Sequence, residues 1–416
     1  MNRIVYFIFI VQVISFNLSA QESQGSSKID FNGYFSGMPS LSWYSDAHVK
    51  GLRDTSAWQV VLHNRLNFTY YASDHFTASL QLRNQLIGGE YIKIMNIENG
   101  FVKQNYFLPL TFQQEFGDQY MLSLSADRAW VQYTYNNLEI KAGRQRINWG
   151  QTFVWNPNDL FNSYNFFDFD YPERPGADAI RILYYPSYTS AVDLAVKIDS
   201  AGNATGGLLY RFNKWQTDFQ IIAGYFKNEN KLIAADTLPS VSWTDEDIVG
   251  GLGFSSALGN VSIRGEASYF YTLKDREIYD DLFLISLACD YSFPDQTTLM
   301  FEFMYNSNVT LTGSSFLSFY AGTQNVKSLT FTKYNAFGQV TYPVTPLLNA
   351  SLSGMYFWDD ALKGGYLGPS LEYSVGDNTS LGLYYQFFAF GIKLGSTGDT
   401  EKANSSFAFI RLKWNF

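Results

Sequence analysis

The chain ends in the stretch FAFIRLKWNF, residues Phe407–Phe416, whose side chains alternate between two characters. In an extended strand every second side chain points to the same face. One face is oily and the other is mostly polar: the first holds Ala408, Ile410, Leu412, Trp414 and Phe416, the second Phe409, Arg411, Lys413 and Asn415. A soluble sheet with one buried face shows the same alternation, so the rest of the chain must decide whether the oily face meets a protein core or lipid.

The first twenty residues, MNRIVYFIFIVQVISFNLSA, have the features of a secretory signal peptide. Arg3 supplies a short basic region, residues 4–16 form an apolar run, and the segment ends on small residues at Ser19 and Ala20. The apolar run is too short for a membrane anchor, because a transmembrane helix needs about 20 such residues. We expect cleavage after Ala20, with 1–20 as the signal peptide and 21–416 as one mature domain.

The composition beyond the signal peptide suits a membrane-spanning sheet. No later stretch of about 18 consecutive apolar residues is present, so no transmembrane helix is expected there. Aromatic residues make up 18% of the chain, yet its mean hydropathy is slightly negative at −0.14. Transmembrane β-barrels combine these properties, because every second side chain faces lipid and aromatic girdles flank the lipid-facing band. The single cysteine cannot form an internal disulfide, and the net charge of −9 argues against a nucleic-acid partner.

Segments of about ten residues with a two-residue alternation recur along the whole mature sequence. We count eighteen such segments, the first over 28–37 and the last over 403–416. Short and longer connections alternate strictly between them. The pattern predicts an all-β fold, a transmembrane antiparallel up-and-down β-barrel of about 18 strands with short periplasmic turns and longer extracellular loops.

The connections themselves carry further information. The short ones are rich in turn residues, as in the Asn213–Lys214 pair. The longest loops are expected near 85–125 and 149–176. Because 85–125 contains YIKIMNI, which resembles half of a further hairpin, sixteen and twenty strands are the alternatives to eighteen.

Closing the cylinder requires the last strand to pair with the first. Phe416 would then lie at the periplasmic membrane interface within an aromatic girdle. A last strand that alternates and ends on Phe also resembles the signal that the barrel-assembly machinery reads in outer-membrane proteins. We therefore expect the protein in the bacterial outer membrane, in contact with lipid and lipopolysaccharide.

A barrel of roughly 16 to 18 strands is wide enough to hold water, and the polar face of each strand lines it. Basic residues on that face fall on the second to eighth strands and acidic residues on the ninth to sixteenth. The expected lining comprises the basic Arg65, Arg83, Arg128 and Arg181 and the acidic Asp218, Glu266, Asp290, Glu302 and Glu372. Two interpretations are open: opposed walls that set up a transverse field acting on solutes, or charges that pair and hold the wall together.

The most distinctive stretch is AGRQRINWGQTFVWNPNDLFNSYNFFDFDYPERPGADAIR, residues Ala142–Arg181. Strict alternation would point Arg144 and Arg146 into lipid, where a charge costs about 2–4 kcal/mol at mid-bilayer. Either both arginines lie at the outer rim, or a bulge at Gly143 turns them inward. We favour the bulge, which adds both arginines to the basic lining.

The loop after these arginines is rich in aromatic residues, which are unlikely to stand in water as an exposed patch. Folded inward, it would narrow the channel and offer flat faces for sugar rings. The expected constriction residues are Trp149, Phe153, Trp155, Asp159 and Phe161. A structural lid packed on itself is an equal alternative.

The segment GRQRINWGQTFVWNPNDLF, residues Gly143–Phe161, also resembles a known family. It is similar to the GRQ-type strand with following Trp-Gly and Asn-Pro residues of Gram-negative outer-membrane porin-like barrels in the alginate-export and related uncharacterised groups. The resemblance implies an eighteen-stranded pore with an arginine-lined conduit, a role that we transfer to Arg144 and Arg146 alone. Because the lumen here is not overwhelmingly basic, an anionic polysaccharide substrate is doubtful.

No catalytic, metal or cofactor motif accompanies this pattern. The three histidines are scattered and the single cysteine faces lipid, so neither a metal site nor a Cys/His nucleophile is expected. We therefore expect no enzyme and no cofactor. The leading hypothesis is a porin-like channel for passive diffusion or export of small hydrophilic or saccharide solutes. The alternative is a barrel closed by its loops that binds surface polysaccharide as an attachment module.

Overall fold

The structure is a computed structural model that describes residues 28–45, 55–90, 92, 106–162, 173–232, 241–274, 280–309, 325–393 and 400–416. The expected signal peptide lies outside the described residues. No helix among the described residues is long and apolar enough to cross a membrane.

The described residues are mainly β-strand, with a short 3-10 helix, η1 (Val326–Ser328), near the interior of the sheet. The strands are β1 (Ile29–Ser45), β2 (Thr55–Tyr71), β3 (Phe76–Gly89), β4 (Thr111–Phe116), β5 (Tyr120–Tyr135), β6 (Leu138–Gln145), β7 (Ala177–Ser187), β8 (Ser190–Ile198), β9 (Ala204–Lys214), β10 (Thr217–Leu232), β11 (Val241–Leu258), β12 (Val261–Thr272), β13 (Leu282–Ser292), β14 (Thr298–Asn306), β15 (Tyr334–Thr345), β16 (Leu348–Trp358), β17 (Leu362–Gly376), β18 (Thr379–Lys393) and β19 (Thr400–Asn415).

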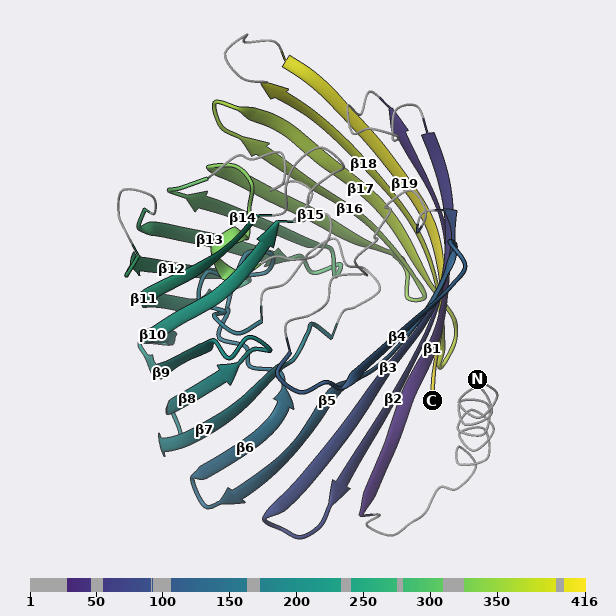
Figure 1. Cartoon of the computed structure of the whole chain (residues 1–416). Helices are drawn as coiled ribbons and strands as arrows, with labels where there is room; N and C mark the ends of the chain where they lie inside the picture. Colours follow the sequence, from purple (N-terminus) through teal and green to yellow (C-terminus); the bar gives the residue numbers. More distant parts are fainter. Residues whose placement is uncertain are drawn as a thin grey trace.

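These strands form one closed antiparallel barrel (Figure 1). Each wall strand pairs with the next along the chain, and β19 pairs with β1 in a register that joins Tyr34 to Asn415 and Ser45 to Asn404. Eighteen strands make up the circumference, because β3 pairs directly with β5 and β4 adds to one side of β5 only. The expectation of a closed eighteen-stranded barrel is therefore confirmed, and the alternatives of sixteen and twenty strands are wrong.

Two predicted boundaries need correction. The first strand runs to Ser45, beyond the predicted end at residue 37, because Leu41 and Trp43 continue the outward-facing alternation after Pro39. The tight turn expected at Asn213–Lys214 lies at Trp215 and Gln216, whose φ angles of 54° and 60° suit the primed turns that join antiparallel strands. In both places the tertiary pairing extends the strand beyond a residue that favours turns.

The outer face of the barrel is apolar, as the alternation in the last strand predicts. On β19, Ile410 and Leu412 are 46% and 52% exposed, whereas Phe409 is buried on the inner face. The same pattern repeats around the barrel, where Leu, Ile, Val, Tyr, Phe and Trp side chains on almost every strand are exposed. Such a surface is suited to lipid.

The last residue takes part in closing the wall. The backbone of Phe416 exchanges two hydrogen bonds of 3.0 Å with Gly33 on β1. Its ring lies 5.5 Å from Phe31, 5.6 Å from Phe35 and 5.3 Å from Trp414 between ring centroids. An aromatic cluster thus covers the junction of the first and last strands at the end of the barrel that carries the short turns.

The interior is divided into an apolar and a polar part. A large apolar core joins the inner faces of β7 to β18 to side chains that enter the lumen, among them Trp149, Trp155 and Leu160 before β7 and Leu329 and Phe331 after η1. The inner faces of β1, β2, β3 and β5 instead line a polar pocket. This polar pocket therefore lies against a different part of the wall from the apolar core.

Candidate functional site

The polar pocket depends on a segment, residues 146–162, that leaves the wall after β6 and enters the barrel; we call it the inward loop. Gly143 has a φ of +114°, and a Cβ at this position would lie 2.2 Å from the carbonyl oxygen of Ala129. Only glycine adopts such a conformation readily. The pairing of β6 with β5 and β7 continues through Gly143 without a register shift, so the predicted bulge is wrong. The positive φ redirects the chain instead.

Arg144 is fully buried at the point where the chain turns inward. Its Nε and Nη2 donate to the two carboxylate oxygens of Asp178 on β7, at 2.8 and 3.0 Å. Arg144 Nη1 also donates to the carbonyl oxygen of Ala126 at 3.0 Å and Nη2 to that of Leu108 at 2.6 Å. The guanidinium lies 3.8 Å from the ring centroid of Tyr106. Because all these partners belong to the wall or to the segment that packs on it, Arg144 joins structural elements and does not face a solute path. In this respect the expectation that Arg144 lines the pore is wrong.

Strand β6 ends at Gln145, which leaves part of the wall between β5 and β7 without a strand. Residues 106–116 occupy this part of the wall. Strand β4 pairs with the first part of β5, whereas β6 pairs only with residues from Ala129 onwards. Tyr106 forms a bridge with Asp199, after β8. Strand β4 is therefore a patch added to the wall and does not enlarge the barrel. The YIKIMNI stretch, considered as half of a further hairpin, lies outside the described residues except for Ile92.

Two carboxylates on the wall hold the inward loop by its backbone amides. Glu266 on β12 accepts hydrogen bonds from the amides of Gln151, Thr152 (2.7 Å) and Asn158 (2.9 Å). Buried backbone N–H groups need such partners, and charged acceptors make the stronger bonds.

Glu302 on β14 binds the next part of the loop. It accepts from the amides of Phe153 and Val154 at 2.9 Å and from that of Trp155 at 2.8 Å. Glu266 is 2% exposed and Glu302 is 0% exposed. The two residues thus face the interior, but the loop covers them and separates them from solute.

The aromatic side of the loop packs into the apolar core. Trp149 is fully buried, its Nε1 donates to Asp193 at 2.8 Å, and Phe161 meets its ring edge-on at 4.8 Å. Trp155 is buried, while Phe153 is partly buried with Arg264 lying 4.5 Å from its ring centroid. The four predicted aromatic residues therefore anchor the loop inside the barrel, as the inward-folded interpretation requires.

Asp159 is the fifth predicted constriction residue and is also buried. It belongs to the loop and lies outside the membrane-spanning strands. Loss of hydration on burial raises the pKa of this carboxyl to about 7, with Glu266 adding to the rise and Arg174 and Arg146 opposing it. The charge at this position is therefore sensitive to pH near neutrality.

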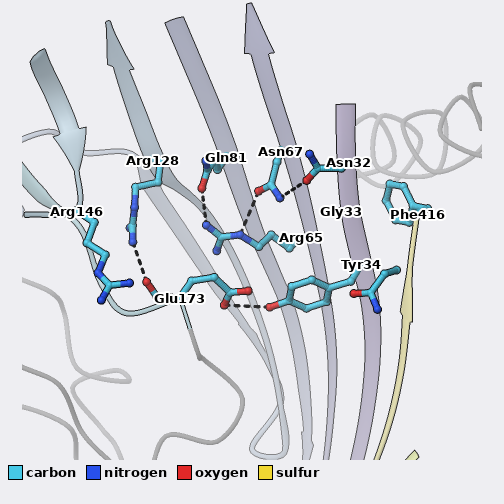
Figure 2. A pocket seen from close by; sticks show the side chains of 11 residues that line it. Asn32, Gly33, Tyr34, Arg65, Asn67, Gln81, Arg128, Arg146, Glu173 and Phe416 are labelled. Atoms are coloured by element: carbon cyan, nitrogen blue, oxygen red, sulfur yellow. Dashed lines mark hydrogen bonds between the residues drawn. The ribbon is translucent and has the colours of Figure 1, made fainter. Parts of the chain in front are cut away.

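The polar pocket, with a volume of about 460 Å³, lies beside the inward loop and against β1, β2, β3 and β5 (Figure 2). Charged residues on its lining are Arg65, Arg128, Arg146 and Glu173. Asn32, Asn67, Gln81 and Asn415 add amide groups, and Tyr34, Gly33 and Phe416 complete the lining. Arg146 is exposed, unlike its neighbour Arg144.

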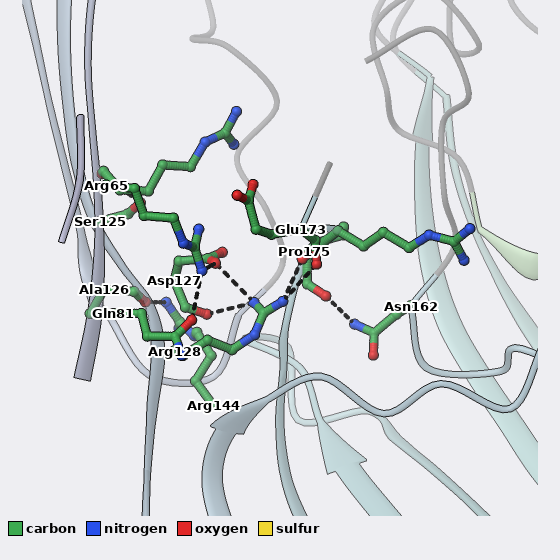
Figure 3. Close-up of polar contacts among 12 residues, drawn as sticks. Arg65, Gln81, Ser125, Ala126, Asp127, Arg128, Arg144, Asn162, Glu173 and Pro175 are labelled. Atoms are coloured by element: carbon green, nitrogen blue, oxygen red, sulfur yellow. Dashed lines mark hydrogen bonds and ion pairs between the residues drawn. The ribbon is translucent and has the colours of Figure 1, made fainter. Parts of the chain in front are cut away.

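Arg65 and Arg128 share one carboxylate, that of Asp127 (Figure 3). The distances to its Oδ2 are 2.8 Å from Arg65 Nη2 and 3.1 Å from Arg128 Nη1. Asp127 is an extra residue on β5, where the register against β3 shifts between Gln81 and Leu82. A bulge therefore does occur, at Asp127 and not at Gly143, and it brings a counter-ion to the basic wall.

The other predicted lining residues also have partners. Arg83 is half-buried opposite Arg65 in the β2–β3 register, and Arg181 pairs with Asp193 at 2.6 Å. Near the short turns, Asp218 accepts from Asn213 at 2.8 Å, Asp290 pairs with Arg264 at 3.2 Å, and Glu372 pairs with Arg411 at 3.0 Å. The interpretation of charges that pair within the wall therefore holds for Arg181, Asp290 and Glu372.

Four residues of the site are not predicted from the sequence: Asp127, Asp178, Glu173 and Tyr34. Asp127 adjoins Arg128 in the chain, which is a usable signal for an ion pair. The other three meet their partners across long separations, such as the 139 residues between Tyr34 and Glu173. Only the closed barrel brings them together.

An eighteen-stranded barrel with an apolar outer surface, an inward loop and a polar pocket is the fold of porin-like barrels of the bacterial outer membrane. Solved structures share this fold. Acinetobacter baumannii OccAB1 matches with a TM-score of 0.53 at 11% identity, over 95% of this chain and 99% of its own. Pseudomonas aeruginosa OccK11 (OpdR) matches with a TM-score of 0.53 at 8% identity, over 93% of this chain and 96% of its own. OpdK of the same organism, solved with vanillate, matches with a TM-score of 0.51 at 11% identity, over 93% of this chain and 99% of its own.

These likenesses concern the fold. No protein-family model matches the sequence, and no curated protein matches it. The resemblance to Gram-negative porin-like barrels is confirmed at this level, while the narrower comparison with alginate-export barrels stays a prediction.

Proposed function

We propose that the protein is a passive channel through which small hydrophilic solutes, small saccharides included, cross the outer membrane along their concentration gradient. The observation that carries the proposal is the polar pocket of about 460 Å³ beside the inward loop. Its amide, guanidinium and carboxylate groups replace the hydrogen bonds that such a solute makes with water.

The inward loop supplies selectivity by size. It is anchored to the wall by six backbone amide bonds to Glu266 and Glu302 and packs into the apolar core, so the passage is confined to the side of β1, β2, β3 and β5. A narrowed passage of this kind admits small solutes and hinders larger ones.

The basic lining favours solutes with an anionic group. Arg146 is exposed at the pocket, and Arg65 and Arg128 also line it and share one counter-ion, Asp127. The vanillate in the OpdK structure is a small aromatic carboxylate, and the guanidinium groups that line the pocket suit a carboxylate.

A barrel closed by its loops that binds surface polysaccharide is the second candidate. It draws on the same apolar core, since the inward loop fills part of the lumen. Binding of glycans without conductance would select this function. The expectation that the protein is not an enzyme, and those of contact with lipopolysaccharide and the barrel-assembly machinery, stay predictions.

The deciding experiment uses the purified protein in planar bilayers and in liposomes. The channel predicts stepwise conductance, and liposome swelling that is rapid with monosaccharides and slower as the sugar grows. A barrel that is sealed in both measurements contradicts the proposal.

A further inference from the structure

Glu173 gives the pocket a second chemical character. Among the described residues that line the pocket, it is the one carboxylate, and three guanidinium groups line the same space. Figure 2 shows its side chain between Arg146 and Tyr34. A carboxylate at this place weakens the binding of a simple anion, because like charges repel at short range.

The position of Glu173 is set by the wall on two sides. Arg128 Nη2 donates to the backbone carbonyl oxygens of Glu173 at 3.1 Å and Arg174 at 2.5 Å. The hydroxyl of Tyr34 on β1 donates to Glu173 Oε2 at 3.2 Å, which joins the segment before β7 to the opposite side of the pocket. Glu173 is half-buried, so its carboxylate is held in place and still borders the pocket.

Arg146 approaches the pocket from the other end of the same connection between β6 and β7. Asn162 Oδ1 accepts from the amide of Ile147 at 3.0 Å, and its Nδ2 donates to the carbonyl oxygen of Pro175 at 2.8 Å (Figure 3). Asn162 thus ties the two ends of the connection together. The exposed guanidinium of Arg146 and the carboxylate of Glu173 are thus carried by one tethered unit. Their spacing does not depend on independent movements of two wall strands.

We propose that this pocket is a two-ended site for small zwitterions, such as a free amino acid or a dipeptide, with the solute carboxylate at Arg146 and its ammonium group at Glu173. This inference rests on the proposed channel function and adds the substrate class. A guanidinium binds a carboxylate through two parallel hydrogen bonds, and a carboxylate accepts from an ammonium group. The volume of about 460 Å³ lies within the range of small-molecule sites.

The arrangement also explains how the site discriminates zwitterions from cations and dianions. A plain cation meets three guanidinium groups, and a dianion meets Glu173, so each places a like charge against the wall. A zwitterion satisfies both ends, and specificity of this kind is a difference between attractive and repulsive contacts.

Flux of diglycine and of N-acetyldiglycine into liposomes tests the proposal, because acetylation removes the ammonium group and keeps the carboxylate. We expect wild-type protein to pass diglycine faster by about fivefold, and Glu173→Gln to abolish that preference, as suits one partly exposed ion pair. Glu115→Gln on the exposed strand β4 is the matched control and should keep the preference. Heat-resistant mobility on gels checks that each variant is folded.

Wild-type protein alone provides a second reading if Glu173→Gln does not fold. An α-amino group loses its proton near pH 8, so the diglycine preference should disappear between about pH 7 and 9. Equal fluxes of the two peptides through a conducting wild-type barrel would overturn the zwitterion site and leave the channel intact. A wild-type barrel that passes neither peptide and carries no current would instead refute the proposed channel function.

Discussion

Replacing Glu302 by Gln should release the inward loop while leaving the barrel closed. In the wild type, Oε2 accepts from the amides of Phe153 and Val154, and Oε1 accepts from that of Trp155 and from Ser286 Oγ. Glutamine has nearly the same shape, but one of its oxygens becomes an NH2 group. That group faces hydrogen-bond donors and cannot accept from them.

The magnitude follows from the number of lost bonds. Two hydrogen bonds to a charged acceptor are lost, each worth roughly 1.5–3 kcal/mol, so the loop loses about 3–6 kcal/mol of docking free energy. Since 1.4 kcal/mol corresponds to a factor of ten, the undocked population should rise by about 100-fold or more. The apolar contacts of Trp149 and Trp155 remain and keep the loop partly docked.

Hydrogen exchange measures this change directly at the backbone amides of residues 153–155. We expect those amides in Glu302→Gln to exchange about 100-fold faster than in the wild type, with unchanged protection in β19, and single-channel conductance to rise. Glu115→Gln serves as the control, because this exposed residue on β4 makes no contact with the loop among the described contacts. Unchanged exchange at 153–155 in a folded variant would refute the assignment of Glu302 as an anchor.

The remaining predictions concern the turn into the lumen and its charges. Arg144→Ala should lower the free energy of unfolding by about 3–5 kcal/mol in urea titrations, because the buried Asp178 carboxylate loses its cationic partner. Arg146→Ala should leave stability nearly unchanged and shift the reversal potential toward cations, an effect that weakens as added salt shortens the Debye length below about 8 Å. Gly143→Ala should prevent docking of the loop, seen as increased proteolysis within 146–162, because of its φ of +114°. Burial raises the pKa of Asp159 to about 7, so the folded protein holds this proton more tightly than the unfolded chain and stability should fall as pH rises from about 4 to 7; Asp159→Asn should remove that part of the slope.

The sequence by itself determined the barrel. Alternation such as that of Ile410, Leu412 and the intervening Arg411 requires a wall with one oily and one polar face, and its recurrence along the chain sets the number of strands. The alternation of short and long connections sets the up-and-down order. Both signals are local, because side-chain direction in a strand depends only on position along it.

The burial of the aromatic residues before β7 can also be predicted from the sequence. Trp149, Trp155 and Phe161 are too apolar to stand in water, and the barrel interior is the space that the chain can reach after β6. Sequence could not separate an inward loop from a lid, because the two differ in the partners that the backbone finds and not in the residues that need burial.

The tertiary structure alone decided the role of each charge. Arg144 and Arg146 are two residues apart in one sequence motif, yet one is buried against Asp178 and the other borders the pocket. Glu266 and Glu302 look like lining residues in any alternating strand, and they bind loop amides more than a hundred positions away in the chain. Burial and ion pairing depend on which groups meet across the lumen, and that is set by closure of the whole barrel and not by any local stretch.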